Sequence, residues 1–154
     1  MSVTQLSEHF SLAEMTITKS GLLNIPDHAQ IIALEALCEN VLEKIHAHFQ
    51  RPVIVTSGFR SPEVNAAAGG KSNSQHLKGE AADIHIEGIH NADIFHFITE
   101  TKDFQYDQCI AEMLSETNGA QGWVHVSYSL YQTRRDARSF IGNGKYVKGL
   151  HYAS

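Results

Sequence analysis

Apolar residues recur at spacings of three and four between positions 29 and 49, and this pattern predicts the clearest helix of the chain. The positions that share its apolar face are Ile31, Leu34, Cys38, Val41, Leu42 and Ile45. Such a stripe is expected to pack against a sheet, and Asp27 or His28 lies near the start of the helix. A second helix is predicted over 92–102, where Asn91 can cap the first turn.

Strand patterns follow in four segments, 53–56, 81–86, 106–113 and 123–130. In WVHVSY the apolar and polar positions alternate, so Trp123, His125 and Ser127 share one face of a strand. Residues 114–122 include Asn118-Gly119, which favours a hairpin between the last two strands. Strands interleaved with helices predict a single α+β domain with a small, mainly antiparallel sheet.

The remaining segments are predicted from residues that favour the start of a helix and from glycines that end one. Residues 1–20 form an N-terminal arm with a short helix capped by Ser7 or Ser11. Ser61 can cap a helix that starts at Pro62 and stops at Gly69-Gly70. We expect residues 71–80 to be a loop and residues 131–154 to be a C-terminal tail.

Candidate metal ligands stand in and after the stretch 57–86. His76 precedes Asp83 by seven positions, and Gly79 between them permits a turn that brings the two together. With His125 they supply two imidazoles and a carboxylate, the three protein ligands that a catalytic zinc site needs. Spacing alone is a weak signal, because a loop histidine and a solvated aspartate look the same.

Composition narrows the class of protein. The chain has 154 residues, of which 42% are hydrophobic and 19% charged, as in a globular domain. A formal net charge of -5 argues against a nucleic-acid partner. No apolar run approaches the roughly 18 residues of a membrane span. The start of the chain lacks the basic and apolar regions of a signal peptide, so we expect synthesis in the cytoplasm. Cys38 and Cys109 lie in apolar patterns and are expected to be buried free thiols.

Three motifs in order carry a family resemblance: SGFRSPEVNAAAGG, SQHLKGEAADI and WVHVSY. Together with SEHFSLAEMT near the N-terminus, they resemble the zinc D-Ala-D-Ala carboxypeptidase family, whose fold is shared by the hedgehog signalling domain. The similarity is greatest to small peptidoglycan peptidases, many of them from phages and prophages. The resemblance implies this α+β fold and Zn²⁺ held by His76, Asp83 and His125.

Arg60 in SGFRS matches the arginine with which that family contacts substrate. A guanidinium meets a carboxylate with two parallel hydrogen bonds, so the residue type suits a substrate anchor. The structural alternative is an arginine that bridges a helix end to a loop. Ser74, Gln75 and Ser127 are placed to orient ligands or substrate, and we assign Ser74 and Gln75 to substrate binding. Trp123 is expected to pack beneath the site.

The general base is harder to assign. Many relatives place an acid three residues before the last ligand, but this chain has Gly122 there. We assign the role to Glu112, which the predicted hairpin places near its end and roughly across from His125. Glu116 in the hairpin tip is the second choice, and a solvated strand end is the structural alternative. His85 shares a strand face with Asp83 and is an alternative ligand or hydrogen-bond partner.

The predicted function is a zinc metallopeptidase that hydrolyses a peptidoglycan peptide. Its substrate is a stem peptide or muropeptide, cut as a D-Ala-D-Ala carboxypeptidase or an L-Ala-D-Glu endopeptidase does, in lysis or wall remodelling. We expect a monomer that acts at the cell wall once released or exported. An inactive metal-stabilised binding module is the alternative, and a structural part of a phage assembly is a third. The tail arginines, Arg134, Arg135 and Arg138, are expected to be solvated or to contact anionic wall polymer.

Overall fold

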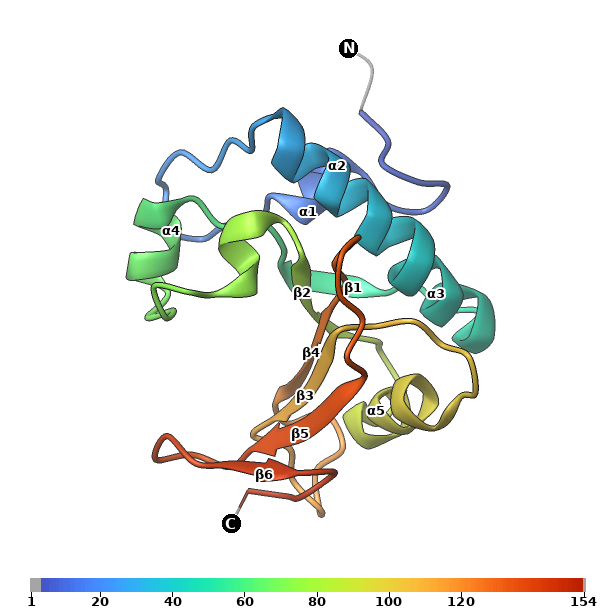
Figure 1. Cartoon of the computed structure of the whole chain (residues 1–154). Helices are drawn as coiled ribbons and strands as arrows, with labels where there is room; N and C mark the ends of the chain where they lie inside the picture. Colours follow the sequence, from blue (N-terminus) through green and yellow to red (C-terminus); the bar gives the residue numbers. More distant parts are fainter. Residues whose placement is uncertain (1–3, 154) are drawn as a thin grey trace.

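A six-stranded sheet in the order β1-β2-β4-β3-β5-β6 forms the centre of the computed structural model, which describes residues 4–153 (Figure 1). The strands are β1 (Ile54–Ser57), β2 (Ala81–His85), β3 (Gln108–Glu112), β4 (Trp123–Ser127), β5 (Asp136–Phe140) and β6 (Tyr146–Lys148). Every neighbouring pair is antiparallel except β3 and β5, which are parallel. The predicted α+β fold with a mainly antiparallel sheet is therefore confirmed.

The helices lie around this sheet (Figure 1). They are α1 (Leu12–Met15), α2 (His28–Leu37), α3 (Glu43–Phe49), α4 (Pro62–Ala67) and α5 (Asn91–Glu100), with a π-helical turn η1 (Cys38–Leu42) and a 3-10 turn η2 (Gln75–Lys78). The predicted helix over 29–49 is the continuous run α2-η1-α3. Asp27 begins it with a capping box to Gln30, and Gln50 ends it in the left-handed conformation.

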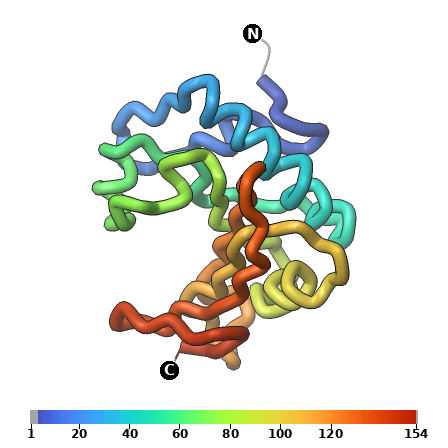
Figure 2. The backbone as a smooth tube through the Cα atoms, viewed as in Figure 1, coloured from blue at the N-terminus to red at the C-terminus, as the bar shows by residue number. Residues whose placement is uncertain are grey.

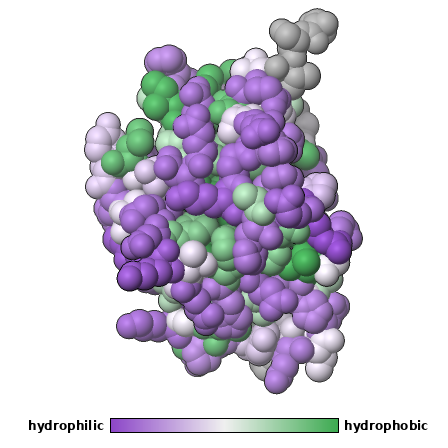
Figure 3. All heavy atoms as spheres, turned by 90° about the vertical axis from the view of Figure 1, so that its right-hand side faces the viewer, coloured by the Kyte–Doolittle hydropathy of each residue, from purple (hydrophilic) through white to green (hydrophobic). Residues whose placement is uncertain are grey.

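The two faces of the sheet differ in polarity because side chains alternate along each strand. One face enters the hydrophobic core and carries Ala82, Ile84, Cys109, Ala111, Val124 and Val126, each of which is fully buried. Apolar side chains of α2, η1, α3 and α5 cover that face. Seen from the side of α3 and α5, the molecule presents mainly hydrophilic residues to solvent (Figure 3). The opposite face of the sheet is left to carry polar side chains.

The N-terminal arm has polar contacts both within itself and to α3. Ser11, not Ser7, caps α1, and it forms a capping box with Glu14. Ser7 instead donates to Glu43 on α3 at 2.6 Å, and the ring of His9 contacts the same carboxylate at 2.7 Å. The arm is thus tied to the long helix.

Two predicted details of the middle of the chain are wrong. Asn91 does not cap α5, whose N-cap residue is His90 without a side-chain bond. The Asn91 amide instead donates to the carbonyls of Gln121 and Gly122, which ties α5 to the β3-β4 hairpin. Residues 71–80 are not wholly a loop, because Ser74 caps the turn η2 within them.

The C-terminal segment is more ordered than a tail. It forms β5 and β6, and β5 extends the sheet by pairing in parallel with β3. Its arginines are not a plain solvated surface. Arg134 donates to Asp107 at 2.8 Å, and Arg135 lies over the ring of Tyr106. Arg138 donates to Asp136, two positions earlier in β5. Residues 1–3 and 154 of the predicted arm and tail lie outside the described residues.

Two further expectations concern the core and the surface. Cys38 and Cys109 are both buried free thiols, as predicted. Burial raises the pKa of Cys38 to about 12, so this thiol stays protonated at neutral pH. Among the described residues, no helix has both the length and the apolar character needed to cross a membrane.

Candidate metal centre

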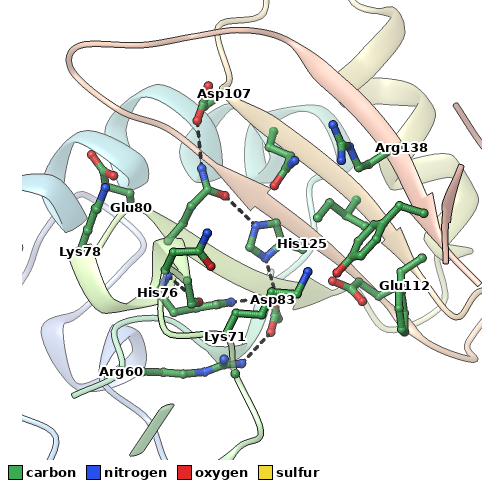
Figure 4. A pocket seen from close by; sticks show the side chains of 18 of the residues that line it. Arg60, Lys71, His76, Lys78, Glu80, Asp83, Asp107, Glu112, His125 and Arg138 are labelled. Carbon is green, nitrogen blue, oxygen red and sulfur yellow. Dashed lines mark hydrogen bonds and ion pairs between the residues drawn. The ribbon is translucent and has the colours of Figure 1, made fainter. Parts of the chain in front are cut away.

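Two histidines and an aspartate meet on the polar face at the centre of the sheet (Figure 4). Asp83 on β2 and His125 on β4 are directly opposite each other in the strand register. His76 reaches them from η2. One possible ligand atom from each residue lies within 4.8 Å of the others, and the side chains are buried, with 3%, 6% and 7% exposure for His76, Asp83 and His125. Within residues 4–153 these form the one such metal-binding group.

The ring of His76 is held by a backbone carbonyl on one side and faces a carboxylate on the other. Its Nδ1 lies 2.7 Å from the carbonyl oxygen of Gly58, which can only accept a hydrogen bond. The ring nitrogen Nε2 is left facing Asp83 Oδ1 at 3.3 Å. Gly79 ends η2 at φ 72, and a Cβ there would come within 2.6 Å of the Gln30 carbonyl. The turn that presents His76 therefore requires glycine at this position.

His125 is held between two oxygen atoms. Its Nδ1 lies 3.2 Å from Asp83 Oδ1, and its Nε2 lies 3.1 Å from the side-chain oxygen of Gln75. Gln75 thus sits beside the site, where the sequence analysis placed it, and contacts a ring of the triad. Ser74 accepts a bond from the His76 backbone and so supports η2 as well as lining the pocket.

Arg60 lies against the same carboxylate. Its guanidinium approaches Asp83 Oδ2 at 3.4 Å and also bonds Ser57 Oγ at 2.9 Å and Asn65 Oδ1 at 3.3 Å. Burial raises the pKa of Asp83, but the charges and hydrogen bonds of the two neighbouring histidines outweigh burial and hold its pKa far below the ordinary value. Asp83 is therefore ionised and suited to a cation.

Glu112 enters the pocket from the neighbouring strand. In the register of β3 and β4, Ile110 lies opposite His125, and Glu112 lies opposite Trp123, one step toward the hairpin. Because Ile110 and Glu112 point to the same face, the Glu112 carboxyl lines the pocket beside the triad (Figure 4). Burial raises its pKa, and the charge of His125 partly offsets that effect. A carboxyl of raised pKa beside a metal site is suited to proton transfer.

Gly122 stands where the family resemblance led us to look for an acid, and its backbone does not suit a side chain. It adopts φ +76, and a Cβ would lie 2.2 Å from the carbonyl oxygen of Glu112 and 2.7 Å from that of Met113. A side chain at position 122 thus meets backbone atoms that cannot move aside. Glu112 is the glutamate of this hairpin that lines the pocket.

Three other sequence candidates fall in different places. His85 pairs with Ile54 at the far end of β2 and does not line the pocket. Glu116 is exposed in the hairpin tip and does not line it either. Trp123 does not pack beneath the site, because it is 38% exposed and forms part of the pocket wall. A strand residue on the polar face has no core beneath it to enter.

The triad opens into a pocket of about 1150 Å³. Residues from two segments line it, and we call 68–80 the first wall and 129–146 the second wall. The tube view draws the first segment in green and the second in orange to red (Figure 2). The cations that line the pocket are Arg60, Lys71, Lys78, Arg134 and Arg138. The second wall was not expected, because residues 131–154 were predicted to be a tail.

The donor set fits a zinc ion. Two imidazoles and one carboxylate are the ligand types of catalytic zinc sites, which leave a further position open. His76 directs its Nε2 into the site because its Nδ1 is engaged elsewhere, and the ionised Asp83 balances part of the charge of a dication.

Comparison with known proteins agrees with this chemistry. The model of the family described as peptidase M15 matches residues 8–127, which is more than half of the chain. A segment of 39 residues is 49% identical to the zinc D-Ala-D-Ala carboxypeptidase of Streptomyces albus G. That segment covers 25% of this chain and 15% of the length of the enzyme. On the extent of the family match, the chain belongs to the peptidase M15 family.

Proposed function

We propose that this chain is a zinc-dependent peptidase that hydrolyses a peptide bond of peptidoglycan. The observation that carries the proposal is the meeting of His76, Asp83 and His125 in an open pocket of a peptidase-family fold. The partial relative from Streptomyces is named as a zinc enzyme that acts on D-Ala-D-Ala, which supports both the metal and the class of substrate.

His76, Asp83 and His125 are the proposed ligands of one zinc ion per chain. When bound, zinc acts as a Lewis acid on the scissile carbonyl and lowers the pKa of water. His76 presents Nε2, because Nδ1 is engaged by the Gly58 carbonyl, and Asp83 presents Oδ1, which faces both rings. All three side chains are held by the fold, so little ordering is needed to bind the ion.

Glu112 is the proposed general base. It accepts a proton from the attacking water and later passes that proton to the leaving amine. Its carboxyl lies in the pocket beside His125. Burial keeps its pKa raised, so its carboxylate is a stronger base than that of an ordinary glutamate.

Arg60 is the proposed contact for a substrate carboxylate or for the developing oxyanion. Its guanidinium lines the pocket and is held by Ser57 and Asn65, so it is fixed in place before substrate arrives. The bond to Asp83 gives it a structural role as well. Ser74 and Gln75 line the same wall of the pocket, where the sequence analysis placed substrate contacts.

The proposed substrate is a stem peptide or muropeptide. Cleavage of a terminal D-Ala-D-Ala bond and cleavage of an L-Ala-D-Glu bond are both chemistries of this kind of site. Either activity suits cell lysis or wall remodelling by a chain made in the cytoplasm and then released or exported to the wall. The mass of the product distinguishes the two bonds.

The test is incubation of zinc-loaded protein with purified muropeptides, followed by mass spectrometry. We expect a new product whose mass names the bond. Glu112→Gln keeps the size of the side chain but cannot accept a proton, so we expect turnover to fall about 10²–10⁴-fold with zinc content unchanged. Glu116→Gln, a matched change in the exposed tip, is the control and should retain wild-type turnover.

An inactive metal-stabilised module is the alternative function, and it was suggested by the missing acid at position 122. Glu112 in the pocket supports the enzyme over the module. Intact muropeptides after prolonged incubation with zinc-loaded wild-type protein would favour the module.

A further inference from the structure

A line of hydrogen bonds runs from the C-terminal segment to the triad. Figure 4 shows the part of it between Asp107 and His125. Arg134 donates to Asp107 Oδ1 at 2.8 Å and to Oδ2 at 3.1 Å. Asp107 Oδ2 accepts from Gln75 Nε2 at 2.9 Å, and the other end of that amide, Oε1, lies 3.1 Å from His125 Nε2. Four residues far apart in sequence thus form one connected network.

We propose that Gln75, oriented by Asp107 and Arg134, is a positioning residue that fixes the ring of His125 for metal binding. The proposal rests on the metal site proposed above, and it concerns how that site is held. It assigns a role to Arg134, which lies beyond residues 8–127 of the family match. The segment outside the match would then contribute to the strength of metal binding.

The direction of every bond in the line follows from donor and acceptor chemistry. Arginine can only donate, and an ionised carboxylate can only accept. Gln75 must therefore turn its NH₂ toward Asp107, which leaves its oxygen facing His125 Nε2. An oxygen there accepts a hydrogen bond from Nε2–H, so the proton resides on Nε2 and the lone pair of Nδ1 is free on the side of Asp83.

Asp107 is built to stay charged. It is 4% exposed, and Arg134 bonds it with both its backbone and its guanidinium. Burial raises the pKa of Asp107, but the bonds from Arg134 and Gln75 outweigh burial and lower its pKa below the ordinary value. An ionised Asp107 can accept a hydrogen bond but cannot donate one, so it allows only one orientation of the Gln75 amide.

The two rings of the triad are held by different means. His76 is oriented by the backbone carbonyl of Gly58, which no side-chain substitution removes. His125 is oriented by a side chain whose own orientation depends on a third residue, Asp107. Both polar ends of Gln75 are occupied in this way. A substrate contact by Gln75 would require breaking the network, so we infer support of His125 as its main role.

Asp107→Asn tests the proposal with a change of a single atom. The Asn oxygen stays with Arg134, so its NH₂ faces Gln75 and forces the Gln75 amide to turn over. His125 Nε2 then meets an NH₂ group and the proton moves to Nδ1, where it opposes metal binding. We expect the zinc dissociation constant, measured by competition with a chelator, to rise about 10–100-fold.

Asp136→Asn is the matched control. Asp136 also accepts from a glutamine, Gln108, at 2.9 Å and from an arginine, Arg138, at 2.6 Å, but neither partner has a hydrogen bond to the triad among the described residues. Its zinc affinity should equal that of the wild type. Equal weakening by both substitutions would show a general loss of stability and would overturn the positioning role.

Nuclear magnetic resonance of the zinc-loaded protein detects the imidazole N–H protons directly. If Gln75 and Asp107 only stabilised the fold, substitutions there would leave these signals unchanged. We expect protected signals from His125 Nε2–H and His76 Nδ1–H in the wild type. Asp107→Asn should remove or shift the first and leave the second in place. Gln75→Leu, which deletes the bond to His125, should do the same and decides the matter if Asp107→Asn does not fold.

Two results separate the proposals from each other. Zinc binding that requires His76 and His125 but is unchanged in both Asp107→Asn and Gln75→Leu would overturn the positioning role and leave the peptidase proposal intact. Wild-type protein that binds no zinc would overturn the proposed function itself.

Discussion

At the scale of single residues, the site depends on which ring nitrogens of its histidines are already hydrogen-bonded outside the triad. His76 Nδ1 is engaged by the Gly58 carbonyl, and His125 Nε2 faces the oxygen of Gln75. Each ring therefore has one nitrogen left to face Asp83. The sequence shows that two histidines and an aspartate are present, but these commitments arise only when distant segments fold together.

The backbone at Gly122 predicts that a side chain there lowers the stability of the fold. Gly122→Ala meets the carbonyl of Glu112 at 2.2 Å, whereas Gly21→Ala has nothing within 4 Å, and the two glycines share nearly the same φ, +76 and +75. The left-handed backbone alone should cost about 1–2 kcal/mol in Gly21→Ala. The added contact should cost a further 1–3 kcal/mol in Gly122→Ala.

Urea denaturation of both variants measures the two costs. Equal free energies of unfolding for Gly122→Ala and Gly21→Ala would show that the hairpin accommodates a side chain at position 122. In that case the backbone would no longer explain why this chain lacks an acid there.

The residues of the site differ in how far they could be predicted. The motifs identified His76, Asp83, His125 and Arg60 as candidates, and the structure brings all four together. The link from Gln75 to Asp107 spans 32 positions and has no local pattern that would reveal it. Trp123 was misplaced because alternation gives the face of a strand but not which neighbours cover that face.

At the scale of elements, patterns that depend on near neighbours were predicted well. The alternation in WVHVSY and the Asn-Gly signal gave the antiparallel β3-β4 hairpin, and the apolar stripe gave the long helix. β5 and β6 were not predicted because they are short and partly exposed. In addition, β5 pairs in parallel with β3, which lies far back in the sequence. Their strand character comes from that long-range pairing.

The attachment of the N-terminal arm to α3 is predicted to depend on pH. Burial raises the pKa of Glu43, but hydrogen bonds from Ser7 and His9 outweigh it, so the pKa falls below the reference value of 4.5. The hydrogen bond to Glu43 raises the pKa of His9 above 6.5. The Glu43 contribution is present above 4.5 and is lost as pH falls through the folded pKa. The His9 contribution is present below 6.5 and is lost as pH rises through the folded pKa.

The arm should therefore be held most firmly between about pH 4.5 and 6.5. Hydrogen exchange at the Leu12 amide, which bonds the Thr4 carbonyl within the arm, reports on this contact. Glu43→Gln should flatten the pH dependence of its protection factor. Glu39→Gln changes an exposed carboxyl nearby and should leave the profile as in the wild type. A flat wild-type profile would contradict the prediction.

At the scale of the whole molecule, the sheet brings together segments from three parts of the chain. The turn η2 supplies His76, the central strands supply Asp83 and His125, and the C-terminal segment supplies the second wall of the pocket. The core on the other face, covered by the long helix and α5, fixes the strands on which the ligands stand. The family match ends at residue 127, and the second wall lies beyond it.

The central claim is that His76, Asp83 and His125 hold the zinc ion on which peptidase activity depends. Anomalous diffraction at the zinc edge, from crystals of the zinc-loaded protein, tests it most directly. We predict one strong peak per chain, bonded to His76 Nε2, Asp83 Oδ1 and His125 Nδ1. A peak at any other group of residues, with this triad empty at full zinc loading, would contradict the claim.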